Sequence, residues 1–237
     1  MNHIVALSGG WDSTAMALRL AEVEPRPYVY LITPTGDELP EMVEHWANLE
    51  CLLGTRLIRV TEETLNGLIG HYRALPNWRQ RWCTRQLKIV PCLRYLKDHQ
   101  PALLYVGLRA DEDAREGIYS PDVECRFPLR EWGWGRAEVK RYVQDRGVSV
   151  PARTDCARCY GQRVGEWRRL WERHPAIYAD AEAQEEVVGH TFRSPARDSY
   201  PTSLKGLRLH FEANPRLPMI EDDIEDEEFA SCRVCRL

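Results

Sequence analysis

The sequence predicts an α/β fold in which a parallel, twisted sheet carries helices on both faces. Two observations lead to this class. Short apolar runs alternate with segments of helical periodicity over the first two thirds of the chain, which favours a parallel sheet covered on both sides. The length of 237 residues also allows one complete domain with a smaller appended part, or two small domains.

Each element has its own signal. In chain order, the apolar runs and helical spacings predict a strand over residues 4–7, a helix over 12–23, a strand over 28–32, a helix over 41–53, and strands over 55–60 and 103–108. Gly9 and Gly10 end the first strand, and Asp12 or Ser13 is the expected N-cap of the first helix. Ligands of open α/β sheets lie beyond the carboxyl ends of the strands, so a site is expected at residues 8–12, 33–41 and 107–115.

The rest of the chain is predicted to be helical and then acidic. Helices are expected over residues 139–146, 162–174, 178–187 and 203–212. Residues 221–228 hold seven acids around one Ile, which is typical of a solvated linker. The expected parts are therefore an α/β domain over 1–150, a smaller helical part over 151–220 with a C-x-x-C motif, and an acidic tail over 221–237 that ends in a second C-x-x-C.

The composition indicates the class of protein and the cellular compartment to expect. Hydrophobic residues make up 43% and charged residues 29% of the chain, as in an ordinary globular protein, and the net charge is −4. No apolar run approaches the roughly 18 residues of a membrane span. The sequence enters a strand at once, which leaves no room for a signal peptide, so a cytoplasmic protein is expected. In that compartment the eight cysteines are better interpreted as thiols or metal ligands than as disulfides.

Residues 8–14, SGGWDST, join the first strand to the first helix. Two glycines let the backbone curl so that several N–H groups face one anion, and the helix N-terminus adds partial positive charge. Ser8, Ser13 and Thr14 add hydroxyl groups. The segment lacks the GK[ST] ending of a Walker loop, which argues against chemistry at a γ-phosphate. It predicts a phosphate-binding loop, and a plain turn between strand and helix is the alternative.

This loop resembles the SGGxDS signature of the PP-loop ATP pyrophosphatase family. Further segments are similar to the branch that contains phosphoadenylylsulfate reductases and the sulfurtransferases that thiolate nucleic acids: TGDELPE (35–41), RWCTRQLKIVP (81–91), GLRADEDAR (107–115) and FPLREWGWGRAEVKRYV (127–143). The resemblance covers about residues 4–160 and implies an adenine nucleotide alpha hydrolase-like fold.

The resemblance also implies a set of site residues. The expected ATP-binding residues are Ser8, Gly9, Gly10, Trp11, Asp12, Ser13, Thr14, Thr35, Gly36, Lys88, Gly107, Arg109 and Arg115. Of these, Asp12, Lys88 and Arg109 are the expected catalytic residues. Arg109 can grip a phosphate bidentately, which a lysine cannot. Asp12 or a carboxylate within 37–41 is expected to hold Mg²⁺.

The intact loop implies that the whole triphosphate of ATP is bound. By resemblance, reductases that act on a ready-made adenylyl sulfate have a degraded loop and a Glu-Cys-Gly-Leu-His tail, and this chain has no such tail. The expected reaction is attack of a substrate oxygen on the α-phosphate with release of pyrophosphate. A sulfur or nitrogen nucleophile would then displace AMP.

The cysteines allow two ligand sets. Cys156 and Cys159 form one C-x-x-C and Cys232 and Cys235 a second, which together make four thiolates for Zn²⁺ or an iron–sulfur cluster. The rival set, implied by the resemblance to sulfurtransferases with a [4Fe–4S] cluster, joins Cys83 to Cys156 and Cys159, with a tail cysteine or none as fourth ligand. We favour the cluster over zinc. The others, Cys51, Cys92 and Cys125, are predicted to be small buried side chains.

A basic lobe surrounds the first C-x-x-C. It contains Arg153, Arg158, Arg163, Arg168, Arg169 and Arg173, with Trp167 and Trp171 four residues apart on one helix face. Such a lobe suits a tRNA or DNA backbone. In the competing interpretation, which we favour, the tryptophans are core and the arginines form a solvated face.

Together these patterns predict an ATP pyrophosphatase that adenylates a substrate, for sulfur transfer to a nucleic-acid or small-molecule acceptor. ATP, Mg²⁺, a [4Fe–4S] cluster and a sulfur-donor protein are the expected cofactors and partners, no membrane is expected, and a homodimer is one possible assembly. Two alternatives stay open: a thiol-dependent reductase of phosphoadenylylsulfate, and a nucleotide-binding module with structural zinc.

Overall fold

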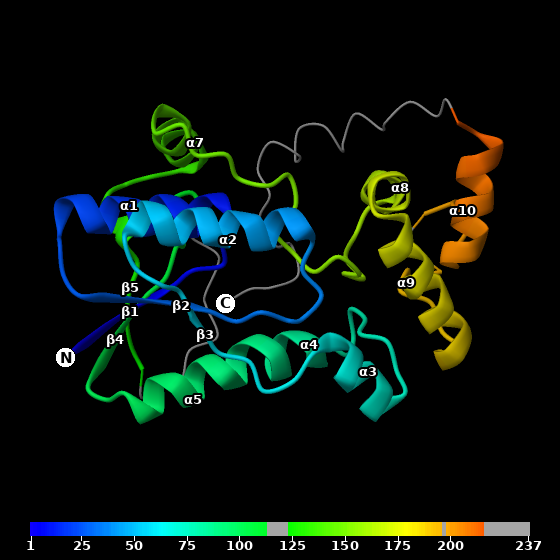
Figure 1. The fold of residues 1–237 in the computed structure, drawn as a ribbon, viewed down its shortest axis with the longest axis horizontal. Coiled ribbons are helices and arrows are strands. Elements are labelled where there is room, and N and C mark those ends of the chain that lie inside the picture. Colours follow the sequence, from blue (N-terminus) through cyan, green and yellow to red (C-terminus); the bar gives the residue numbers. More distant parts are fainter. Residues whose placement is uncertain (113–122, 196–197, 216–237) are drawn as a thin grey trace.

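Five parallel strands form one sheet in the order β3-β2-β1-β4-β5 (Figure 1). They are β1 (Asn2–Ala6), β2 (Tyr28–Ile32), β3 (Ile58–Arg59), β4 (Ala102–Tyr105) and β5 (Glu124–Arg126). The structure is a computed structural model that describes residues 1–112, 123–195 and 198–215. Val5 of the central strand pairs with Tyr30 on one side and Tyr105 on the other. The strand order reverses between β1 and β4, so the ligand-binding crevice of such a sheet lies at their carboxyl ends.

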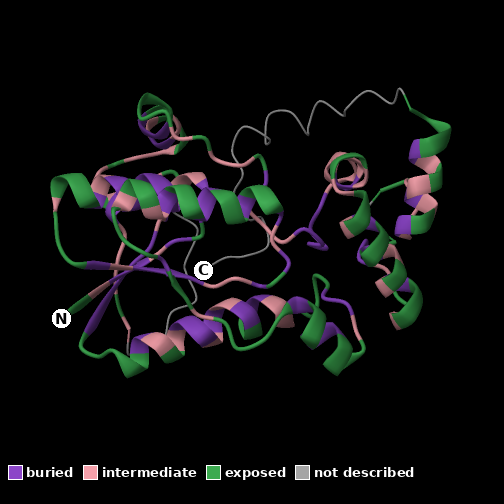
Figure 2. Ribbon diagram, in the orientation of Figure 1, coloured by how far each residue is buried: buried purple, intermediate pink, exposed green. Residues whose placement is uncertain are grey.

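Alternate side chains of each strand enter two different cores. Val5, Tyr30 and Tyr105 face α1 (Trp11–Val23), α2 (Pro40–Leu53) and α7 (Arg136–Asp145). Ile4 and Leu104 face the opposite way, toward α5 (Val90–Asp98). Both faces of the sheet are therefore covered, as Figures 1 and 2 show, and the predicted α/β class is confirmed.

The helices near the carboxyl end of the described chain form a separate group, α8 (Val164–Arg173), α9 (Pro175–Val188) and α10 (Leu204–Ala213) (Figure 1). Their core is built around Trp167, Tyr178 and Phe211, and it also takes in Leu68 of α3 (Leu65–Tyr72) and Leu39 before α2. A single core thus joins the helical group to residues that follow β2.

Several elements were not predicted. These are α3, α4 (Trp82–Thr84), the π-helical turn η1 (Arg85–Ile89), α5, β5 and α6 (Pro128–Glu131). Gly67 and Gly70 lower the helix propensity of α3, and Pro91 falls inside the run that becomes η1 and α5. In that run the π-helical turn precedes Pro91, which occupies the first turn of α5, where proline is tolerated.

The expected N-cap of the first helix was wrong. Gly10 is the N-cap of α1 and has no side chain to cap it, while Asp12 and Ser13 lie inside the helix and bond to Arg109 and to the loop backbone. The acidic run and its terminal C-x-x-C lie outside the described residues. Among the helices of the described part, none has the length and apolarity needed to span a membrane.

Candidate active site

The loop between β1 and α1 is organised by two serine hydroxyls. Ser13 Oγ accepts the N–H of Gly9 at 3.1 Å and lies 3.2 Å from the carbonyl oxygen of Gly10. Ser8 Oγ accepts the N–H of Gly10 at 3.2 Å and lies 3.0 Å from Ser13 Oγ. These bonds curl the backbone back over the start of α1, whose first turn carries no side-chain cap. A helix start of this kind attracts an anion.

Gly9 is the position in this loop where a side chain has no room. Its φ of +86° lies in the left-handed region. A Cβ there would collide with Met42 Cε and lie 2.9 Å from Trp46 Nε1. The same indole nitrogen donates to the carbonyl oxygen of Ser8 at 3.1 Å. Helix α2 therefore supports the loop from behind, and this support requires glycine.

The segment after β4 closes the other side of the crevice. Gly107 lies so close to α1 that a Cβ would come within 3.2 Å of the Asp12 and Ser13 backbone. Arg109 Nη1 donates to both carboxylate oxygens of Asp12, at 3.1 and 2.9 Å. Its Nε donates to Asp111 at 2.8 Å, and Nη2 lies 3.5 Å from Glu112. The guanidinium thus joins the segment after β4 to the loop between β1 and α1.

The carboxylates around Arg109 determine its pKa. Burial alone would lower the pKa of Arg109, but Asp12, Asp111 and Glu112 raise it above the ordinary value. The pKa of Asp111 is lowered against the effect of burial, by the backbone N–H of Arg136 and by Arg109. The arginine is therefore held in its charged form, as phosphate binding requires. Arg115, also expected here, lies outside the described residues.

The turn after β2 is stabilised by its own glutamate. Glu38 accepts the N–H and the hydroxyl of Thr35, at 2.6 and 2.7 Å, and the N–H of Gly36 at 3.0 Å. Gly36 has a φ of +72°, and a Cβ on it would lie 2.8 Å from Thr64 Cγ2. The start of α3 is joined to the same turn, since Leu65 N–H donates to the carbonyl oxygen of Thr35 at 2.8 Å.

The next residue of this turn, Asp37, makes an ion pair with Arg158 from the C-x-x-C segment. Arg158 donates from Nε to Asp37 Oδ1 at 2.6 Å and from its backbone N–H to Oδ2 at 2.9 Å. Burial raises the pKa of Asp37, and the charge of Arg158 opposes that rise. The sequence analysis named Asp37 as a possible magnesium ligand and Arg158 as part of the basic lobe, but it did not predict that they pair, because nothing in the local pattern of either segment points to the other.

Three cysteines line one pocket beside this ion pair. Cys83 comes from α4, and Cys156 and Cys159 come from the segment that follows α7. The wall of the pocket also includes Thr35, Leu65, Pro76, Thr84, Lys88, Asp155, Arg158 and Tyr160. Thr35 Oγ1 lies 3.3 Å from Cys156 Sγ. The Cys83, Cys156 and Cys159 set is thus brought together.

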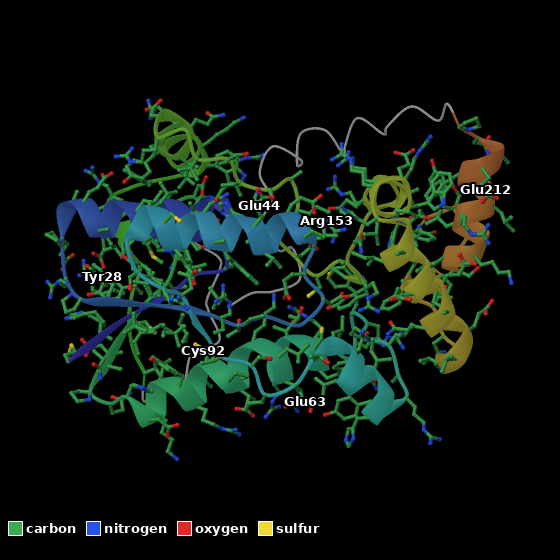
Figure 3. The ribbon with its side chains drawn as sticks, in the orientation of Figure 1. Tyr28, Glu44, Glu63, Cys92, Arg153 and Glu212 are labelled. Carbon is green, nitrogen blue, oxygen red and sulfur yellow. The ribbon has the colours of Figure 1, made fainter. Side chains whose placement is uncertain are left out.

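No group of three or more His, Cys, Asp or Glu side chains within 1–112, 123–195 and 198–215 is placed to hold a metal ion. Cys232 and Cys235 lie outside those ranges. Cys51 was predicted to be buried but is exposed on α2. Cys92 is buried on α5, where it faces the sheet (Figure 3), and burial raises its pKa to about 11.

The carboxylates expected to hold Mg²⁺ all have partners. Asp12 pairs with Arg109 and Asp37 with Arg158, while Glu38 caps the turn at 35–36. Glu41 Oε1 lies 3.0 Å from His174 Nε2. Of these, Asp12 is the one beside the phosphate loop.

The structure confirms the core interpretation of the basic lobe for its tryptophans but not for two of its arginines. Trp167 is fully buried and Trp171 packs on the same core, as the core interpretation predicted. Two of the arginines, however, point inward instead of forming a solvated face. Arg153 donates to Asp155 and to the carbonyl oxygen of Cys156, and Arg158 is paired with Asp37 (Figure 3 labels Arg153). These two guanidinium groups organise the C-x-x-C segment.

The parallel sheet and its covering helices form a nucleotide-binding type of α/β fold, with a Ser-Gly-Gly loop between the first strand and the first helix. Residues 2–152 match the sequence model of the phosphoadenosine phosphosulfate reductase domain. The chain therefore belongs to that family, the phosphoadenylylsulfate reductase branch of the PP-loop superfamily.

A solved structure with a similar fold is phosphoadenylyl-sulfate (PAPS) reductase from Candida auris in a phosphate complex. The TM-score is 0.52 and the sequence identity 17%, over 63% of this chain and 75% of that chain. At this identity the likeness concerns the fold alone. No curated protein sequence gives a match.

Proposed function

We propose that this protein binds ATP with Mg²⁺ and cleaves it between the α- and β-phosphates to adenylate a substrate. The observation that carries the proposal is the intact loop at residues 8–14. Its two serines hold a curled backbone at the uncapped start of α1, at the edge where the strand order reverses. The loop keeps every residue of the SGGxDS signature that it resembles, which favours the whole triphosphate of ATP as its ligand.

The side chains of this site have different roles in binding the nucleotide. The loop N–H groups and the hydroxyls of Ser8, Ser13 and Thr14 bind the pyrophosphate end. Arg109 grips a phosphate and in doing so exchanges its contact with Asp12 for one with the nucleotide. Asp12, released from the arginine, holds Mg²⁺. Each charge of the pair then keeps an opposite charge beside it throughout.

The reaction is an in-line substitution at the α-phosphorus. A substrate oxygen forms a bond to that phosphorus, and the bond from phosphorus to the α–β bridging oxygen breaks. Pyrophosphate leaves, and the loop N–H groups compensate its new charge; Mg²⁺, if held by Asp12, would supply further charge neutralisation. A sulfur or nitrogen nucleophile then displaces AMP from the adenylated substrate.

The thiol pocket supports sulfur as the group transferred. Cys83, Cys156 and Cys159 reach one pocket from two separate segments, which supports the three-cysteine set for a [4Fe–4S] cluster, although within the described residues the thiols are not already placed around one metal position. Such a cluster, when bound, supplies an iron with an open position for sulfide. Lys88 and Thr35 line the same pocket, so a cation and a hydroxyl lie in the wall that contains the thiols. The acceptor is a nucleic acid or a small molecule, and a sulfur-donor protein is a further partner.

A direct test is product analysis with Mg²⁺ and ATP labelled at the α-phosphate, in the presence of tRNA or DNA as candidate acceptors. The proposal predicts AMP and pyrophosphate in equal amounts, and a large loss in Ser13→Ala, which removes the hydroxyl that organises the loop. Release of ADP and phosphate instead would rule out cleavage at the α-phosphate.

A second candidate is favoured by the family match: a thiol-dependent reductase of phosphoadenylylsulfate. In that case a cysteine thiolate attacks the sulfur of the sulfate, adenosine 3′,5′-bisphosphate leaves, and a dithiol reduces the resulting S-sulfocysteine to release sulfite. Sulfite formation from phosphoadenylylsulfate, without any consumption of ATP, distinguishes this activity from the first.

A further inference from the structure

The turn after β2 and the segment of Cys156 and Cys159 are bound to each other at several points. Arg158 Nη2 lies 2.5 Å and Nε 2.6 Å from Asp37 Oδ1. The N–H of Arg158 donates to Asp37 Oδ2 at 2.9 Å, and the N–H of Ala157 donates to the Asp37 carbonyl oxygen at 2.6 Å. Only 3% of the Asp37 side chain and 6% of the Arg158 side chain are exposed. The two segments are 121 residues apart in sequence, yet they are in direct and extensive contact.

The same turn faces both sites. Thr35 lies 3.3 Å from Cys156 Sγ on the thiol side, and Thr35 and Gly36 are the residues expected to meet the nucleotide. Leu39 and Ala157 belong to one hydrophobic core, so the two segments that the ion pair joins also share apolar packing. Any displacement of the turn is therefore transmitted to the residues on either side of Arg158.

A buried ion pair resists separation more than it adds stability. Taking the two charges apart inside the protein leaves each without a partner in a medium of low dielectric, which is costly. Segments joined in this way move together or not at all. Such pairs are best known for fixing the register of two elements.

We propose that Asp37 and Arg158 are a positioning pair that fixes the thiol segment against the nucleotide turn and makes nucleotide binding detectable at the thiols. Neither side chain touches a reacting atom. The nucleotide part of this inference rests on the proposed function, whereas the positioning part does not. Coupling of this kind is reciprocal, so occupation of the thiol pocket changes the affinity for nucleotide by the same factor.

Amide hydrogen exchange on the full chain tests both parts, because the N–H groups of Ala157 and Arg158 donate to Asp37. The variants are Asp37→Asn and Arg158→Lys. The matched control is Asp198→Asn, which removes a carboxylate from the buried Arg193 at 2.6 Å, away from the thiol segment. Exchange in the peptide covering 155–160 is compared with that in β2, which corrects for any loss of global stability.

Without nucleotide, we expect exchange over 155–160 to be at least about tenfold faster in both variants and unchanged in the control. Equal rates in wild type and variants would overturn the positioning role. With saturating Mg²⁺ and ATP, wild type should exchange about fivefold or more slowly over 155–160, and the variants should not respond. ATP that binds but leaves this peptide unchanged would overturn the coupling alone. Absence of ATP binding would contradict the proposed function, and the first comparison would still decide the positioning role.

Discussion

Arg109 Nη1 lies 3.1 and 2.9 Å from the two carboxylate oxygens of Asp12, and this pair joins the end of β4 to the start of α1. Only 11% of the arginine side chain and 13% of the aspartate side chain are exposed. The pair is therefore largely buried. Under the proposed function, Arg109 is the cation for a phosphate and Asp12 the carboxylate for Mg²⁺, and in this structure each compensates the charge of the other.

Replacement of this arginine should lower nucleotide affinity. We expect Arg109→Ala to reduce AMP formation about 10²-fold, a loss typical for one preorganised charge donor. The activity of Arg109→Lys should lie between those of the wild type and Arg109→Ala, because lysine keeps the charge but lacks the bidentate guanidinium. The matched control is Arg146→Ala, which removes an arginine held at 2.7 Å by both oxygens of Glu22, at the other end of α1. Equal losses in the two alanine variants, measured as kcat/KM for ATP, would contradict a specific role for Arg109.

Glycine at position 9 should be essential for the loop. Gly9→Ala combines a positive φ with a collision against Met42, so it should lower the free energy of unfolding by about 2–4 kcal/mol and displace the loop. Gly54→Ala is the control, since Gly54 has a φ of +63° but open space around it, and should cost about 1 kcal/mol. Urea unfolding and ATP titration of both variants measure the difference. Normal ATP binding by Gly9→Ala would argue against the loop as the phosphate site.

The thiol pocket should bind metal through three cysteines. For protein purified without oxygen, we expect broad absorbance near 400 nm and about four irons per chain. Each of Cys83→Ala, Cys156→Ala and Cys159→Ala should lose most of the iron, whereas Cys51→Ala, at an exposed thiol on α2, should retain it. A colourless protein with one zinc per chain would exclude the cluster and favour the binding-module alternative.

Glu185 makes the stability of the helical part depend on pH. Its carboxylate accepts the N–H groups of Phe192 and Leu204, at 2.8 and 2.7 Å, which ties α9 to the chain before α10. Burial, only partly opposed by these bonds, raises the pKa of Glu185 to about 7. The carboxyl group of Glu185 therefore binds its proton more tightly in the folded state than in the unfolded state. The stabilisation of the folded state by this protonated group is complete below the ordinary pKa of the side chain. It is lost as the pH rises through about 7.

The wild type should therefore lose about 2 kcal/mol of stability between pH 5.5 and pH 8 from this group alone. Glu185→Gln removes the titration and should flatten that part of the pH dependence in urea unfolding. Glu186→Gln, on the exposed neighbour that pairs with Lys205, is the control and should keep the wild-type slope. A slope unchanged in Glu185→Gln would show that another group is responsible.

How far sequence alone reaches differs between fold and site. The buried strand Tyr28–Ile32 was predicted with its exact limits, because a fully apolar run between turns has few other interpretations. Helix α3 was missed, because its two glycines hide the helical spacing and its stability comes from packing against the distant Trp167 core. Strand β5 is too short for its pattern to be read.

In the site, local motifs were readable and distant partners were not. Ser8–Thr14 carries its own signal, and the structure places Gly107 and Arg109 beside it. The pairing of Cys83 with the C-x-x-C came from family resemblance, since spacing alone equally allowed the terminal cysteines. The Asp37–Arg158 pair depends on a tertiary contact over 121 residues, which no periodicity reveals.

Calorimetric titration with ATP, ADP and AMP in the presence of Mg²⁺, and with adenosine 3′,5′-bisphosphate, tests the central claim most directly. If the loop holds the β- and γ-phosphates, ATP should bind most tightly, and each phosphate removed should weaken binding about tenfold, or 1.4 kcal/mol. Equal affinity for ATP and AMP, or tighter binding of adenosine 3′,5′-bisphosphate than of ATP, would contradict the account and favour the reductase.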